Sequence, residues 1–368
     1  MAKIHVRMEV IFIPCLFPKY ALKPESSFAQ ENGKRIQFIS KDIYDDILSG
    51  SNPYLVDPTT GEIHVVPVKI DCGTCFECKR KKATHWAIRM ACEASLYPDV
   101  GLYNNDLVSG SCNWFVTLTY DETYVPHSEK NWDLLTTHLD HVSEFVKRLR
   151  RHWDYHRPDE PPIRVYFCSE YGDKTWRPHY HMILFNFKLF DAKHKFDNFQ
   201  GDRFYTSETL QDLWKFGYVV SSPMNFQTAL YTARYTNKKL YGDNAVDCYD
   251  SNGLERMNTR MSRMPGIGFP YYEQNKDKIF STGSIMLPNG KQYFPPPAFV
   301  KKYLDSVDYQ EALRWYKVKA KFVEGLENKL LNELRETSLS EEEYFKKKVE
   351  TRQKIVNQFP REKFNENL

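Results

Sequence analysis

Apolar residues change their period several times in the middle of the chain, and each period predicts one element. Over 138–156 they recur every three or four residues, which predicts a helix. Segments rich in β-branched and aromatic residues predict three strands, at 112–126, 159–173 and 179–187. Helical spacing returns over 226–242, where the final glycine is expected to end the helix. The order is therefore strand, helix, strand, strand, helix.

The strands at 159–173 and 179–187 are separated by only a few residues. This gap is too short for a crossover helix, so the two strands must pair antiparallel as a hairpin. We therefore predict an α+β fold in which helices flank an antiparallel β-sheet. The predicted domains are a β-rich region over 1–70, a central domain over 71–245, and a mainly helical extension over 246–368 that begins as a linker.

Two histidines share one face of the third predicted strand. Side chains alternate along a strand, so His179 and His181 point the same way. Glu170 ends the preceding strand of the hairpin and can lie opposite the pair. Two imidazoles and a carboxylate suit Mg²⁺ or Mn²⁺ with positions left open for phosphate oxygens. The alternative is one solvated histidine, one hydrogen-bonded core histidine and a surface acid.

Two tyrosines recur at helical spacing in "YTARYTNKK". Tyr231 and Tyr235 are four residues apart, and Lys238 lies on the same face, with Lys239 beside it. Lysine in an aromatic stripe suits an anionic ligand, and two tyrosines could carry a double phosphodiester transfer. The alternative is an aromatic stripe packed on the core.

The overall charge does not indicate a nucleic-acid partner, because 51 Lys and Arg nearly balance 48 Asp and Glu and leave a net charge of +3. Local clusters could still contact phosphates. The basic run in the helix over 138–156 contains Lys147, Arg148, Arg150 and Arg151. These four residues are candidate DNA contacts, or else a solvated helix face.

Three of the eight cysteines fall within seven residues. Cys72, Cys75 and Cys78 have metal-ligand spacing, and a fourth ligand from His85, Cys92 or Cys112 would complete a structural Zn²⁺ site. Reduced core thiols are the alternative. The sequence contains neither a signal peptide nor an apolar run of transmembrane length, so an intracellular, soluble protein without a membrane partner is expected.

Three segments in order resemble the motifs of the HUH endonucleases, the initiators of rolling-circle replication: "FVTLTYD" (115–121), "RPHYHMILF" (177–185) and "YTARYTNKK" (231–239). The paired tyrosines resemble the two-tyrosine subgroup. The cysteine segment, "SEYGD" and the length look most like the initiators of gokushovirus-type microviruses, which are single-stranded DNA phages. The resemblance covers roughly residues 70–245, which would form the HUH-like catalytic domain.

The resemblance implies a function and a site. His179, His181 and Glu170 would bind Mg²⁺ or Mn²⁺, Tyr231 and Tyr235 would be the nucleophiles, and Lys238 or Lys239 the basic residue of the motif. The protein would nick single-stranded origin DNA, keep a 5′-phosphotyrosine bond, leave a 3′-hydroxyl primer and later rejoin the displaced strand into a circle.

Partners and alternatives follow from the same comparison. No GxxxxGK loop occurs in the sequence, so a host helicase and a host DNA polymerase are expected, in the host bacterial cytoplasm. One alternative is a transposase or relaxase of the same chemical class. The other is a zinc-stabilised nucleic-acid-binding protein without catalytic activity.

Overall fold

The computed structural model of the chain describes residues 15, 17–24, 36–49, 65–99, 111–172, 175–198, 201–235, 240, 242–288 and 290–358. These residues form two compact units. The first contains residues 82–332, and the second contains residues 15–81 together with 333–355. The domain boundaries expected at residues 70 and 245 stay a prediction.

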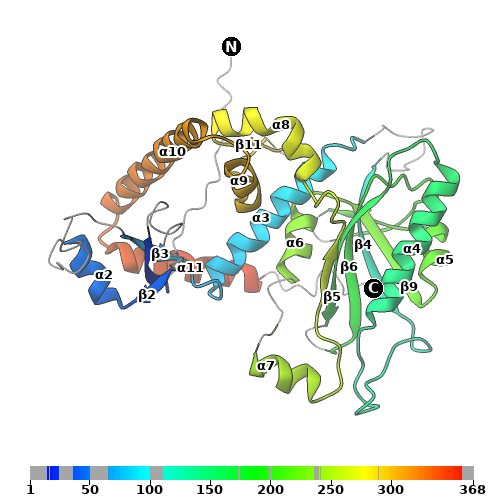
Figure 1. Cartoon of the computed structure of the whole chain (residues 1–368). Coiled ribbons are helices and arrows are strands. Elements are labelled where there is room, and N and C mark those ends of the chain that lie inside the picture. Colours follow the sequence, from blue (N-terminus) through cyan, green and yellow to red (C-terminus); the bar gives the residue numbers. More distant parts are fainter. Residues whose placement is uncertain are drawn as a thin grey trace. The chain divides into compact units, whose positions relative to one another are not determined.

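A seven-stranded antiparallel sheet forms the centre of the first unit (Figure 1). The strand order is β10-β5-β6-β4-β9-β8-β7. The strands are β4 (Asn113–Tyr120), β5 (Arg164–Tyr171), β6 (Pro178–Phe185), β7 (Lys193–Asp197), β8 (Arg203–Thr206), β9 (Gly217–Pro223) and β10 (Thr259–Met261). Strands β5 and β6 form the predicted hairpin, and the antiparallel sheet with flanking helices confirms the α+β class.

Helices cover both faces of this sheet (Figure 1). Alternate residues of β6 divide between the faces: Tyr180, Met182 and Leu184 pack with α4 (Leu139–His156) and α5 (Glu208–Trp214). Ile183 and Phe185 instead pack with α6 (Phe226–Tyr235) and α3 (Phe76–Ala94). His179 and His181 are in phase with this second set, so they belong to the α6 face.

The predicted helix over 138–156 is confirmed as α4, but the helix predicted to run to Gly242 is shorter. Helix α6 ends at Tyr235, residues 236–239 and 241 lie outside the described part, and Gly242 is the N-cap of α7 (Asp243–Ala245). Glycine at φ +61 suits a change of chain direction at either end of a helix.

The segment after residue 243 is more regular than a linker. It contains the π-helical turn η2 (Val246–Asp250), α8 (Phe269–Thr282), the β11 (Ile285–Met286) and β12 (Gln292–Tyr293) hairpin, α9 (Pro297–Leu304) and α10 (Tyr309–Arg335). Burial of Tyr272, Phe280 and Trp315 in one apolar cluster explains this order, which alternating apolar spacing alone did not reveal.

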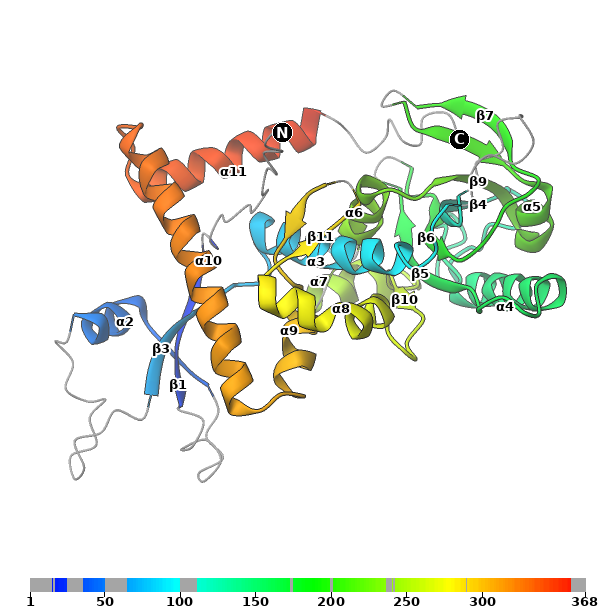
Figure 2. The same cartoon turned by 90° about the horizontal axis from the view of Figure 1, so that it is seen from above.

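The second unit contains the three-stranded antiparallel sheet β2-β1-β3 (Figure 2). Its elements are β1 (Lys19–Pro24), β2 (Gln37–Ile39), α2 (Lys41–Leu48), β3 (Val65–Ile70), the first turn of α3, and most of α11 (Glu341–Gln358). The strand expected at residues 6–13 lies outside the described residues. Helices α10 and α11 confirm the charged C-terminal helices. Among the described helices, none has the length and apolarity needed to cross a membrane.

Candidate active site

The hairpin register brings the three predicted metal ligands together. Glu170 on β5 is directly opposite His179 on β6, and His181 lies two residues further along the same face. Oε2 of Glu170 is 3.1 Å from Nε2 of His179 and 3.1 Å from Nε2 of His181. All three side chains are buried. The hairpin alone therefore gathers two nitrogens and one oxygen around a common point.

The outer nitrogens of both imidazoles are held by polar groups. Nδ1 of His179 is 3.1 Å from the carbonyl oxygen of Arg177, and Nδ1 of His181 is 3.2 Å from Oγ1 of Thr117 on the neighbouring strand β4. A carbonyl can only accept a hydrogen bond, so Nδ1 of His179 carries the proton. In neutral His179 the lone pair of Nε2 then faces the carboxylate of Glu170, and this arrangement is favourable only with a positive charge between them.

The electrostatics of Glu170 agree with such a positive charge. Burial raises the pKa of its carboxyl, but hydrogen bonds to His179 and His181 and the charge of these imidazoles outweigh burial, so the pKa lies well below its usual range. The separations also fit a metal ion. Adjacent ligands of an octahedral ion bonded at about 2.1 Å are about 3.0 Å apart, close to the two distances of 3.1 Å.

Both predicted nucleophiles lie beside these ligands. The ring of Tyr235 stacks on His181 with centroids 4.7 Å apart and an interplanar angle of 19°, and the edge of Tyr231 meets His181 at 5.2 Å. The two tyrosine rings are 4.9 Å apart and nearly perpendicular. Phe115 of β4 stacks on His181 at 5.5 Å. Helix α6 thus presents two phenols, one turn apart, to one histidine of the candidate metal site.

The phenols are sheltered in this state. Tyr231 is 7% exposed and Tyr235 only 2%. Burial raises the pKa of Tyr235 well above its ordinary value, and the charges of Tyr231 and Glu170 raise it further. A neutral phenol is a weak nucleophile, so attack by either tyrosine requires an electrophilic partner and access from outside.

Sequence reasoning missed Thr117 and Phe115, although both lie within the segment "FVTLTYD". Their places beside His181 depend on β4 pairing with β6, with Thr117 opposite His181. Lys238 and Lys239 lie outside the described residues, so the structure does not place them.

The four candidate DNA contacts lie on α4, which covers the other face of the sheet from the triad. Nε of Arg148 donates to the carbonyl oxygen of Leu213, so this side chain is engaged with α5. Lys147 and Arg150 border a groove of about 210 Å³ with Arg260 of β10. Arg151 is exposed on the same helix. The structure therefore brings the four together on one helix but not at the triad.

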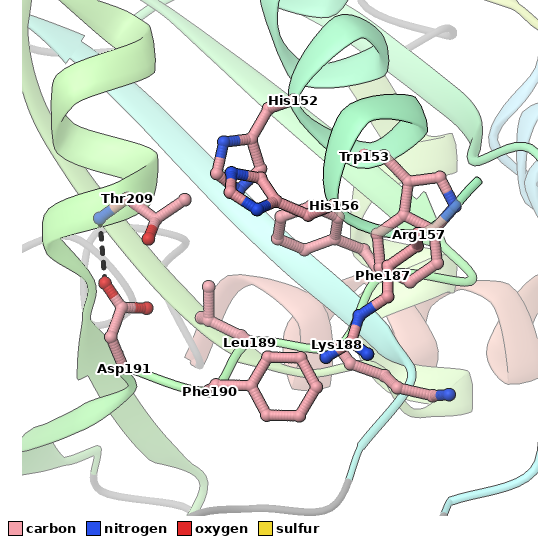
Figure 3. A pocket seen from close by; sticks show the side chains of 10 residues that line it. All are labelled: His152, Trp153, His156, Arg157, Phe187, Lys188, Leu189, Phe190, Asp191 and Thr209. Carbon is pink, nitrogen blue, oxygen red and sulfur yellow. Dashed lines mark hydrogen bonds between the residues drawn. The ribbon is translucent and has the colours of Figure 1, made fainter. Parts of the chain in front are cut away.

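A separate cavity of about 320 Å³ opens between the C-terminal half of α4 and the segment after β6 (Figure 3). It is lined by His152, Trp153, His156, Arg157, Phe187, Lys188, Leu189, Phe190, Asp191 and Thr209. Strand β6 extends six residues beyond His179, about 20 Å at 3.3 Å per residue, so the cavity lies at the far end of the strand from the triad.

In the second unit, the structure brings Cys72, Cys75 and Cys78 together, as their spacing predicts. The fourth sulfur close to them is that of Cys15, rather than a ligand from His85, Cys92 or Cys112. The four sulfurs lie within 4.8 Å of one another. Residue 15 is too distant in sequence for a spacing argument to have found it.

Known proteins share these features of the chain. A family model for the replication-associated protein ORF2 matches residues 113–240, which include the triad and both tyrosines. Replication-associated protein VP4 of Bdellovibrio phage phiMH2K is 32% identical over 252 residues, covering 68% of this chain and 71% of that protein.

Two further relatives are also phage proteins. Replication-associated protein ORF2 of Spiroplasma virus 4 is 30% identical over 62% of this chain and 64% of its own length. Replication-associated protein ORF4 of Chlamydia phage 1 is 29% identical over 62% of this chain and 52% of its own length. No solved structure matches the chain significantly. The coverage of the phiMH2K protein and the match over residues 113–240 show that this chain belongs to the ORF2 family of phage replication-associated proteins.

Proposed function

We propose that the protein initiates rolling-circle replication of a phage genome by nicking one DNA strand at the origin and later rejoining it. One observation carries the proposal: two tyrosines, one helical turn apart, both pack against His181, whose Nε2 lies with that of His179 at the carboxylate of Glu170. A structural aromatic stripe has no need of three buried metal-ligand groups beside it. Membership of a phage replication family agrees with this chemistry.

The residues of the site divide the work. His179, His181 and Glu170 would hold Mg²⁺ or Mn²⁺, which when bound polarises the scissile phosphate and offsets its charge. Thr117 and the carbonyl of Arg177 keep the two imidazoles oriented with Nε2 toward the site. Helix α6 aims Tyr231 and Tyr235 at the same point from one side.

The reaction conserves phosphodiester bonds. The phenolic oxygen of one tyrosine forms a bond to phosphorus and loses its proton, while the bond from phosphorus to the 3′-oxygen breaks and that oxygen takes up a proton. This step leaves a 5′-phosphotyrosine and a free 3′-hydroxyl. After one round of synthesis the second tyrosine repeats the cut, and the released 3′-hydroxyl attacks the first phosphotyrosine. The strand closes into a circle without an energy cofactor.

The remaining assignments complete the proposal. Lys238 or Lys239 would offset charge at the phosphate, and the basic residues of α4 would contact DNA away from the triad. Single-stranded origin DNA is the substrate. A host polymerase would extend the 3′-hydroxyl and a host helicase would open the duplex, both in the host bacterial cytoplasm.

Detection of a covalent adduct tests the proposal. Purified protein is incubated with Mn²⁺ and single-stranded oligonucleotides that tile its own genome, and adducts are separated on a denaturing gel and located by mass spectrometry. We expect an adduct that EDTA abolishes. Tyr231→Phe and Tyr235→Phe should each retain one nucleophile, and the double variant none. Tyr155→Phe is the matched control, since Tyr155 is 80% exposed on α4.

Two results would overturn the mechanism. One is an adduct of unchanged yield in the double tyrosine variant, which would place the nucleophile elsewhere. The other is folded protein that binds these oligonucleotides but forms no adduct with any of them at any Mn²⁺ concentration. That outcome would favour a nucleic-acid-binding protein without catalytic activity.

A further inference from the structure

Four cysteine sulfurs converge in the second unit, away from the residues used for strand transfer. Sγ of Cys15 is 3.8 Å from Sγ of Cys75, and Sγ of Cys72 is 3.9 Å from Sγ of Cys78. Sulfurs joined by a disulfide would be about 2.05 Å apart. Four thiolates bonded to one tetrahedral Zn²⁺ at about 2.3 Å would be about 3.8 Å apart. The two distances match the tetrahedron.

We propose that Cys15, Cys72, Cys75 and Cys78 bind one structural Zn²⁺ ion. All four ligands come from the protein, so the coordination sphere is closed, as in structural rather than catalytic zinc sites. An iron–sulfur cluster fits less well, because each thiolate of a four-iron cluster binds a different iron atom and the sulfurs stand farther apart.

The backbone explains why these cysteines meet. Strand β1 pairs antiparallel with β3, and Lys19 lies opposite Ile70. Cys15 precedes the start of β1 by four residues, and Cys72 follows the end of β3 by two, so both emerge from the same end of the ladder. The backbone N–H of Cys72 donates to Sγ of Cys15 over 3.3 Å. Strand register alone therefore selects the distant fourth ligand.

The turn between the next two ligands favours thiolates. Gly73 has φ +77, a conformation that few other residues adopt readily, and it turns the chain so that the N–H of Cys75 donates to Sγ of Cys72 over 3.3 Å. Oγ1 of Thr74 donates to the same sulfur over 3.6 Å. Donors aimed at a sulfur stabilise its anionic form, which is the form that binds zinc. Cys78 follows in the first turn of α3.

The second unit also needs an additional source of stability. Its sheet has three short strands, and no described residue between 15 and 81 belongs to any of the four buried apolar clusters. In that range the buried residues are Cys15, Ala21, Tyr44, Glu77 and Cys78. Small units with so little core are commonly stabilised by a metal or by disulfides. Zinc would tie the entry to β1, the exit from β3 and the start of α3 together.

Metal analysis of the full chain tests the proposal. Because Zn²⁺ could also bind at the triad, the measurements use the His179→Ala, His181→Ala double variant as the parent. Produced with added Zn²⁺ and freed of loosely bound metal, this parent should retain one Zn²⁺ per chain by elemental mass spectrometry. Replacement by Co²⁺ should give the intense visible bands of tetrahedral thiolate coordination.

Cysteine variants locate the ligands. Cys15→Ala in this parent should lower Zn²⁺ affinity at least about 100-fold in competition with a chromophoric chelator, whereas Cys15→His, which keeps a zinc-binding atom, should recover part of the loss. Cys248→Ala is the matched control and should bind Zn²⁺ as the parent does, since Cys248 is a half-buried thiol of the first unit.

Two results would overturn the proposal. One is a reduced, folded parent that takes up neither Zn²⁺ nor Co²⁺. The other is a Cys15→Ala variant with the Zn²⁺ affinity of the parent, which would exclude Cys15 as a ligand. If Cys15→Ala fails to fold, limited proteolysis of the parent decides: removal of Zn²⁺ should expose residues 15–81 to cleavage, and re-addition should protect them. Cleavage that does not depend on Zn²⁺ would refute the site.

Discussion

Replacing Glu170 by glutamine tests the candidate metal site most directly. The substitution keeps the size of the side chain and removes the only anionic ligand of the triad. The carboxylate is buried, with 4% of its side chain exposed, and its Oε2 is 3.1 Å from each Nε2. In so enclosed a position solvent cannot replace the lost charge. We expect Glu170→Gln to bind Mn²⁺ much more weakly than the wild-type protein.

The size of the effect follows from the role of the carboxylate. Changes in groups that only orient metal ligands cost about 10–100-fold in affinity. Loss of a charged, direct ligand should cost at least the upper end of that range, which is about 2.7 kcal/mol at 1.4 kcal/mol per tenfold. The ion's effect on thermal unfolding should shrink in parallel, because Mn²⁺ at 100 times its Kd stabilises the folded state by about 2.7 kcal/mol.

Isothermal titration calorimetry with Mn²⁺ near pH 8, where ordinary imidazoles are neutral, measures the affinity. Circular dichroism of the metal-free variant checks its fold. Glu144→Gln is the control, since Glu144 is 54% exposed and pairs with Arg148 on α4. Equal Mn²⁺ affinity of Glu170→Gln and wild-type protein would refute the assignment of Glu170 as a ligand.

Three further predictions concern stability. Glu93→Ala should destabilise the first unit by about 3–5 kcal/mol in urea unfolding, because the buried carboxylate pairs with Arg164 and its loss leaves an uncompensated charge; a cost below about 1 kcal/mol would contradict this. Burial and the charge of the adjacent histidine lower the pKa of His141, so the folded state resists its protonation, and stability that is complete above about pH 6.5 is lost as the pH falls toward the folded pKa. His141→Gln should therefore reduce the drop in Tm on acidification, and an unchanged drop would argue against this cause. Gly217→Ala should cost at least about 2 kcal/mol, since a Cβ would lie 2.3 Å from backbone atoms, whereas Gly325→Ala, in open space on α10, should stabilise by about 0.5–1 kcal/mol; equal unfolding midpoints for the two glycine variants would contradict the geometry.

Local periodicity in the sequence determined much of the site. The alternation of β6 placed His179 and His181 on one face, and the short gap after β5 forced the hairpin that puts Glu170 opposite them. Helical spacing placed Tyr231 and Tyr235 together. Each of these relations spans about a dozen residues or fewer, so the geometry of a single strand, helix or hairpin suffices to predict it.

Relations between distant segments required the tertiary structure. Thr117 and Phe115 lie beside His181 only because β4 pairs with β6, and Cys15 meets the other cysteines only because β1 pairs with β3. The basic residues of α4 lie on the other face from the triad because its apolar stripe packs with Tyr180 and Met182. Strand order and the face that a helix covers depend on the burial of the whole core, which no local pattern in the sequence encodes.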